Sequence, residues 1–129
     1  MASAESAARR TAPDENSPPP KVAAIIGCQP DEREMILLLL ELLEWEVLQL
    51  DEVAQLDTPH IRLVFVDADS IEMQDVARSI FCHATPPIVA AFCDPSNLVA
   101  IHSVLALRWN QLTRPIDLEA VERIIDIAA

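Results

Sequence analysis

The chain has 129 residues, of which 51% are apolar, so it is long enough and apolar enough to bury one core. Its formal net charge of −12 argues against binding to nucleic acid or to an anionic membrane, because both need basic patches. The longest apolar run, MILLLL, is too short to span a membrane, and the first twenty residues contain no apolar signal core. We therefore expect a cytoplasmic protein with one folded domain.

The three cysteines, Cys28, Cys82 and Cys93, are odd in number and show no CxxC spacing, which is typical of reduced thiols. A thiol or metal site that combines Cys28 or Cys93 with His60 or His83 is possible in principle. Because the spacing of these residues matches no metal motif, packing in the core is the favoured interpretation.

Residues 1–20 are small, polar and proline-rich, and they end in three prolines. This composition predicts a disordered leader, so the folded domain is expected to span residues 21–129.

The first half of the domain alternates between strand and helix patterns. A continuous apolar run predicts a buried strand over 22–27, and a leucine-rich helix follows over 30–45. A short strand over 46–50 and a weak helix over 51–56, which a proline ends, come next. The second strongly apolar strand covers 62–67.

The second half repeats this alternation. Apolar residues at helical spacing predict a helix over 73–81, followed by a buried strand over 88–92. A helix that Ser96 can cap is predicted up to Trp109, and a short strand over 110–113 precedes Pro115. Asp117 can cap the last helix.

Five strands that alternate with five helices predict a five-stranded parallel sheet with helices on both faces. In such an α/β fold, ligands bind at the carboxyl ends of the strands. The residues expected at this edge are Gly27 and Cys28, Asp67, Ala91 and Phe92, and the segment 113–115.

Three stretches carry a resemblance to a known family: QPDERE after the first strand, LVFVD at the third, and LTRPID after the fifth. With these stretches in this order, residues 21–129 resemble the receiver domain of response regulators in two-component signalling. The resemblance implies a flavodoxin-like (βα)5 fold. The chain is also similar to the N-terminal domains of amidase- and nitrate-type antitermination regulators, in which an RNA-binding segment follows. Whether the chain is a fragment or a stand-alone domain stays open.

The resemblance also implies a phosphorylation site, of which this chain keeps only part. The phosphoacceptor position of receivers corresponds to Asp67, whereas the two acids that help to hold Mg²⁺ correspond to Gly27 and Cys28. Mg²⁺ prefers carboxylate and other hard oxygen ligands, and a thiol is a soft ligand. We therefore expect neither bound Mg²⁺ nor any other cofactor.

The remaining positions implied by the resemblance are also altered. Ala91 is assigned to the Ser/Thr position of strand four, Gln111 to the aromatic position of strand five, and Arg114 to the lysine before the proline. Without a metal, Arg114 is expected to form a structural ion pair with Asp67.

These losses favour a degenerate receiver, or pseudo-receiver, which is not an enzyme and which binds a protein partner or forms a homodimer. The alternative is a phospho-accepting regulator that uses Asp67 in a phosphorelay. Arg108, Trp109 and Gln111 are the predicted interface residues on an otherwise acidic chain. The first helix, which has a wide leucine arc, is the competing surface.

Overall fold

The structure is a computed structural model that describes residues 20–129, so the predicted leader lies outside the described residues except for Pro20. Five parallel strands form one sheet in the order β2-β1-β3-β4-β5. The strands are β1 (Val22–Ile26), β2 (Glu46–Leu50), β3 (Leu63–Asp67), β4 (Ile88–Cys93) and β5 (Asn110–Thr113). The helices described in residues 20–129 are α2 (Pro30–Leu42), the 3-10 helix η1 (Val53–Asp57), α3 (Met73–Ile80), α4 (Leu98–Ala106) and α5 (Leu118–Ala128). The predicted parallel α/β sheet is confirmed.

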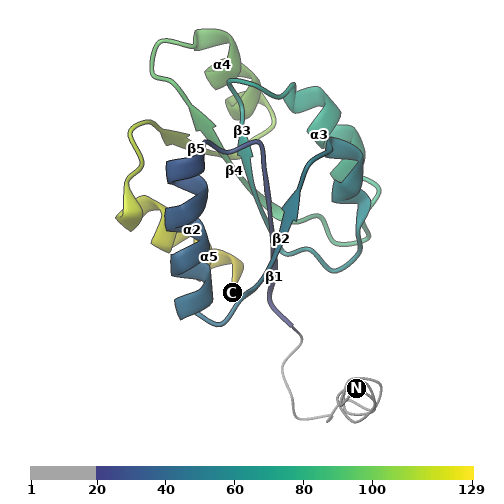
Figure 1. The fold of residues 1–129 in the computed structure, drawn as a ribbon. Coiled ribbons are helices and arrows are strands. Elements are labelled where there is room, and N and C mark those ends of the chain that lie inside the picture. The colour runs from purple at the N-terminus through teal and green to yellow at the C-terminus, as the bar shows by residue number, and fades with distance from the viewer. Residues whose placement is uncertain (1–19) are drawn as a thin grey trace, which may run out of the picture.

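The sheet separates two apolar layers, and the strand sequences explain why. Every residue of β1 and β3 is buried, because both strands lie inside the sheet and are covered on both faces. Helices α2 and α5 cover one face, and α3, α4 and η1 cover the other, as Figure 1 shows. Since β2 and β5 are the two edge strands, their residues are only partly buried.

Alternation along the strands decides which residues face which layer. Phe65 and Phe92 pack into the layer under α2 and α5, whereas Val66 and Ala91 pack into the layer under α3 and α4. Asp67 follows Phe65 by two residues, so its side chain belongs to the α2–α5 side at the carboxyl end of β3.

Local details differ from the sequence predictions at three places. The weak helix predicted over 51–56 is a 3-10 helix, and Asn97 rather than Ser96 caps α4 by accepting a hydrogen bond from Ala100 N–H. Helices α2 and α4 end earlier than predicted. Glu44 (φ 64°) and Arg108 (φ 60°) take left-handed backbone conformations just after them, which reverses the chain toward the next strand. Within residues 20–129, no helix is both long and apolar enough to cross a membrane.

Candidate functional site

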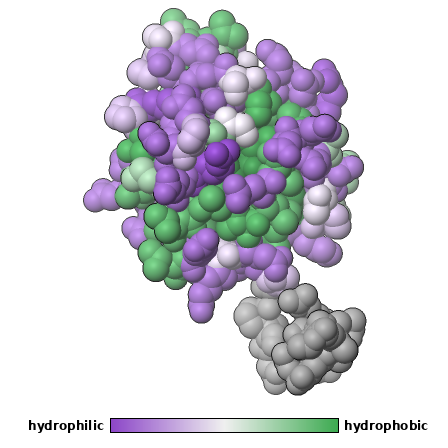
Figure 2. All heavy atoms as spheres, in the orientation of Figure 1, coloured by the Kyte–Doolittle hydropathy of each residue, from purple (hydrophilic) through white to green (hydrophobic). Residues whose placement is uncertain are grey.

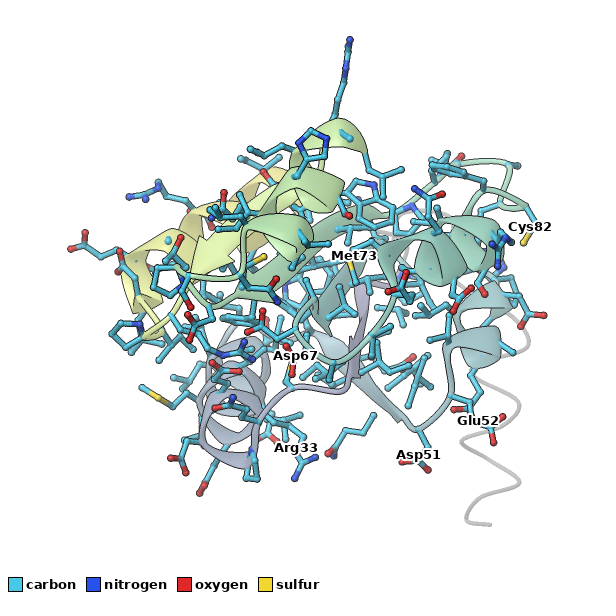
Figure 3. All side chains as sticks on the ribbon, turned by 90° about the horizontal axis from the view of Figure 1, so that it is seen from above. Arg33, Asp51, Glu52, Asp67, Met73 and Cys82 are labelled. Atoms are coloured by element: carbon cyan, nitrogen blue, oxygen red, sulfur yellow. The ribbon has the colours of Figure 1, made fainter. Side chains whose placement is uncertain are left out.

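The carboxyl edge of the sheet contains an ion cluster centred on Arg114, which directly follows β5. Its guanidinium forms a two-pronged contact with Glu32: Nε lies 2.7 Å from Oε2, and Nη2 lies 2.9 Å from Oε1. Nη2 also lies 3.1 Å from Asp67 Oδ1, and Nη1 donates to Asp69 Oδ2. The predicted Asp67–Arg114 ion pair is therefore present, as one part of a four-residue cluster. In Figure 3, which looks onto this edge, Asp67 lies near the centre of the molecule.

Each carboxylate oxygen of the cluster has a hydrogen-bond or ion-pair partner. The two oxygens of Glu32 face Arg114. Asp67 Oδ1 accepts from Asp69 N–H at 2.9 Å, and Asp67 Oδ2 accepts from the Ser70 hydroxyl at 3.0 Å. The oxygens of Asp69 accept from Asn97, from Asp94 N–H and from Arg114. The hydrogen-bond and ion-pair partners of these three carboxylates thus all come from this chain itself.

Burial makes these contacts stronger than surface ion pairs. Glu32 and Asp67 are each 5% exposed, and the Arg114 side chain is 12% exposed. The guanidinium carbon also lies 5.8 Å from the centre of the Phe92 ring, a cation–π distance. The hydrogen bonds to Glu32, together with the charge of Asp67, raise the pKa of Arg114 above its usual range although burial opposes this. Arg114 is a permanent cation at this edge.

Glu32 is the member of the cluster that sequence reasoning missed. It is buried, whereas its neighbours Asp31 and Arg33 in the first turn of α2 are exposed. A signal was present: Glu32 precedes the buried residues Ile36 and Leu40 by four and eight positions, which places it on the inward stripe of the helix. An acid on that stripe needs a buried cation as its partner.

The side chains of Gly27 and Cys28 contribute no oxygen ligand to this edge. Gly27 has φ 72°, which strains any other residue, and a Cβ built there would lie 2.5 Å from Ile71 Cδ1, so an acid at this position would also have to displace the end of the Ile71 side chain. Cys28 is buried. Burial, followed by the charges of Glu32 and Asp67, raises the pKa of its thiol to about 12, so it stays protonated and is a poor ligand.

Mg²⁺, which the receiver resemblance implies, does not fit the residues present. Mg²⁺ needs near-octahedral oxygen ligands and usually keeps one or two carboxylates. Here the carboxylates of Glu32, Asp67 and Asp69 are already bonded to the guanidinium of Arg114. In the described range 20–129, no group of three His, Cys, Asp or Glu side chains could hold a metal ion.

Ala91, which the resemblance assigns to the Ser/Thr position of strand four, does not face the cluster. The residue of β4 that borders the cluster is Phe92. In the sheet register Asp67 pairs with Phe92, and Ala91 pairs with Val66. Because side chains alternate along a strand, Ala91 points into the α3–α4 layer and the Phe92 ring lies beside Arg114. Gln111 is half-buried and donates to the Thr113 hydroxyl, away from the ion cluster.

The predicted interface residues are only partly exposed. Arg108 is exposed at the end of α4, whereas Trp109 is half-buried against the α3–α4 layer. The Trp109 ring lies 6.5 Å from the ring of Phe81. Trp109 is therefore partly buried against the core, and its role in an interface stays a prediction.

No protein-family model and no curated protein sequence matches the chain, but solved structures do. A response regulator receiver protein from Pseudomonas putida has a TM-score of 0.68 at 16% identity, over 86% of this chain and 99% of that one. A CheY-like response regulator from Mesorhizobium loti has a TM-score of 0.63 at 15% identity, over 86% of this chain and all (100%) of that one. The chain has the fold of a receiver domain.

A third similar structure includes a protein partner. It is the co-crystal structure of the Saccharomyces cerevisiae histidine phosphotransfer protein Ypd1 with the receiver domain of Ssk1. The match has a TM-score of 0.64 at 14% identity and covers 81% of this chain and 85% of that one. At such identities the likeness assigns the receiver fold, while the chemistry of the site rests on the residues of this chain.

Proposed function

We propose that this chain is a degenerate receiver that acts as a protein-interaction module in signal transduction without phosphorylation. The observation that carries the proposal is the two-pronged contact of Arg114 with Glu32, extended to Asp67. The guanidinium binds the carboxylates that would otherwise be available to a metal ion or a phosphoryl group. The similarity to antitermination regulators stays a prediction from the sequence.

Phosphoryl transfer depends on a cation that neutralises the transferred group and on an accessible nucleophile. Asp67 is 5% exposed, and its two oxygens are bonded to Asp69, Ser70 and Arg114. To accept a phosphoryl group, Asp67 would have to give up these contacts without compensation from Mg²⁺. The proposal therefore includes no catalytic activity and no cofactor.

The test is exposure of the full chain to acetyl phosphate with and without millimolar Mg²⁺, followed by mass spectrometry of the intact protein. We expect no added phosphoryl group in either condition. Mg²⁺-dependent labelling that disappears in Asp67→Asn would overturn the proposal and support the phosphorelay alternative. A conventional receiver domain in the same reaction mixture serves as the positive control.

The outward side of α4 is the surface that best fits an interaction role. No Asp, Glu, Lys or Arg occurs in this helix, and Leu98, Val99 and Leu105 are 72%, 79% and 56% exposed; the polar His102 is exposed as well. Figure 2 shows a few apolar atoms among hydrophilic ones at the top of the molecule, where α4 lies in Figure 1. A soluble helix normally keeps its outward side polar, so this surface is suited to burial against another protein.

We infer that the occupant is a second copy of this chain. A second α4 offers the same surface, which is largely apolar and has no Asp, Glu, Lys or Arg, so a two-fold contact is self-complementary. The chain otherwise carries 21 acidic against 9 basic residues, so repulsion keeps two copies apart at most other surfaces. We therefore propose α4, and not Trp109, as the surface through which the predicted homodimer forms.

Charge insertion tests this surface. We expect Val99→Glu and Leu105→Glu to convert a dimer to a monomer in light scattering without changing the thermal midpoint. Leu42→Glu is the matched control, because Leu42 on α2 is 79% exposed like Val99. A dimer that survives both α4 variants but is lost in Leu42→Glu would place the interface on the first helix.

A further inference from the structure

Asp69 connects the ion cluster to α4. One of its oxygens, Oδ2, accepts from Arg114 Nη1 and from Asp94 N–H, the latter at 2.8 Å. The other oxygen, Oδ1, accepts from the side-chain amide of Asn97 at 2.8 Å. Its carboxylate is 24% exposed, so the contacts are shielded enough to exceed the strength of a surface pair. A single carboxylate therefore contacts β5, the β4–α4 loop and the start of α4.

Asn97 links Asp69 to the first turn of α4. It is the N-cap of α4, and its side-chain oxygen accepts from Ala100 N–H at 3.2 Å while its amide nitrogen donates to Asp69. An N-cap satisfies backbone N–H groups that the first turn of a helix leaves without partners. Because the two ends of the Asn97 amide are both used, the orientation of the cap depends on where Asp69 lies.

The rest of α4 is held by few side chains. Among its residues only Ala100 and Val104 are buried, and both are small. The apolar area that anchors α4 is thus limited, and polar contacts at its N-terminus have a larger influence on its position. The side-chain hydrogen bonds and ion pairs of Arg114 in the described residues fall on Glu32, Asp67 and Asp69, and none falls on α4.

We propose that Asp69 is a positioning residue that couples Arg114 to the first turn of α4 and so fixes the helix that carries the docking surface. The coupling runs from Arg114 through Asp69 and Asn97 to Ala100 N–H. It deepens the proposed function, because the importance of α4 rests on that proposal. In this chain the forked guanidinium of Arg114, which contacts Glu32 and Asp69 at the same time, holds α4 in one position through Asp69.

Native-state hydrogen exchange of the full chain, followed by NMR, tests the coupling. We expect Asp69→Ala to speed exchange at Ala100 at least tenfold, while amides in the middle of α5, such as that of Ile125, change less than twofold. Asp69→Asn keeps the shape and removes the charge, and it provides the same comparison if the alanine variant does not fold. Asp75→Ala is the control, because it removes an aspartate that is paired with Arg78 on α3.

The decisive readout is the effect of Arg114 on a helix that its side chain does not hydrogen-bond. Arg114→Lys keeps the charge and removes the planar fork, and we expect it to speed exchange at Ala100 in the wild-type background but not in Asp69→Ala. Equal acceleration in both backgrounds, or an unchanged Ala100 in Asp69→Ala, overturns the proposal. If α4 is not the dimer surface, the Val99→Glu and Leu105→Glu results fail while the exchange results stand, so the two proposals can be judged separately.

Discussion

Replacement of Arg114 by methionine is the most informative single change, because it leaves three carboxylates without their shared cation. Arg114→Met removes two charge-assisted hydrogen bonds to Glu32 and the contacts to Asp67 and Asp69, while it keeps most of the apolar stem. A charge-assisted hydrogen bond contributes about 1.5–3 kcal/mol, and breaking a buried ion pair costs about 3–5 kcal/mol. Since Glu32 and Asp67 are 5% exposed, we expect a loss of about 3–5 kcal/mol in the free energy of unfolding.

Urea unfolding followed by circular dichroism measures this loss. With a slope of about 1.5 kcal/mol per molar urea, the midpoint should fall by about 2–3 M. Arg78→Met is the matched control, because Arg78 pairs with Asp75 at 2.6 Å on an exposed part of α3, where the two side chains are 76% and 53% exposed. A pair so exposed to water should contribute little, so the control midpoint should hardly move.

A double-mutant cycle shows whether the loss comes from the ion pair. Glu32→Gln alone should also destabilise, because the amide nitrogen that replaces one carboxylate oxygen cannot accept a hydrogen bond from Arg114. Arg114→Met combined with Glu32→Gln should lose less than the sum of the single changes, since no strong pair is then left half-broken. A single-variant loss below about 1 kcal/mol for Arg114→Met, or additive losses in the cycle, would refute the view that the guanidinium holds the carboxylates of this edge together.

Three further predictions concern the metal, the thiols and the α4–β5 turn. Titration with millimolar Mg²⁺ should give no saturable NMR shifts around Asp67, and saturable shifts centred there would contradict the cluster's exclusion of metal. At pH 8 a thiol reagent should modify the exposed Cys82 in the native protein but not Cys28 or Cys93. Burial raises the pKa values of these two thiols to about 12 and about 11, so both are protonated there; mass spectrometry that shows two or more adducts would contradict this. Arg108→Gly should raise the free energy of unfolding by about 1 kcal/mol, because φ 60° suits glycine, and a lower thermal midpoint would contradict that reasoning.

The structure also changes how a metal site could be restored. The sequence suggests that acids at positions 27 and 28 would create affinity for Mg²⁺. Because Gly27 has a left-handed backbone conformation with Ile71 against it, Gly27→Asp is expected to destabilise the β1–α2 turn. Cys28 does not have a left-handed backbone conformation, so an aspartate at position 28 would not be strained in this way. Arg114 would nevertheless still hold Glu32 and Asp67.

Local sequence patterns were sufficient to predict the fold. Continuous apolar runs mark the buried strands β1, β3 and β4, and helical spacing marks α3 and α5, because burial repeats with the period of the backbone itself. The Asp67–Arg114 contact was also predicted, because the resemblance to receivers matches both positions and the carboxyl ends of parallel strands meet at one edge of the sheet.

Only the tertiary structure decided the finer arrangement of the site. Glu32 joins Arg114 across 82 positions of sequence, and no local pattern identifies which buried acid meets which cation. A shift of one residue along β4 exchanges the two faces of the sheet, which is why Phe92 and not Ala91 borders the cluster. Trp109 lies beside Phe81 and against the core. This contact joins the residue that follows α3 to the residue that precedes β5, and no local sequence pattern predicts it. Periodicity determines which residues are buried, whereas the packing of distant elements determines which partners they find.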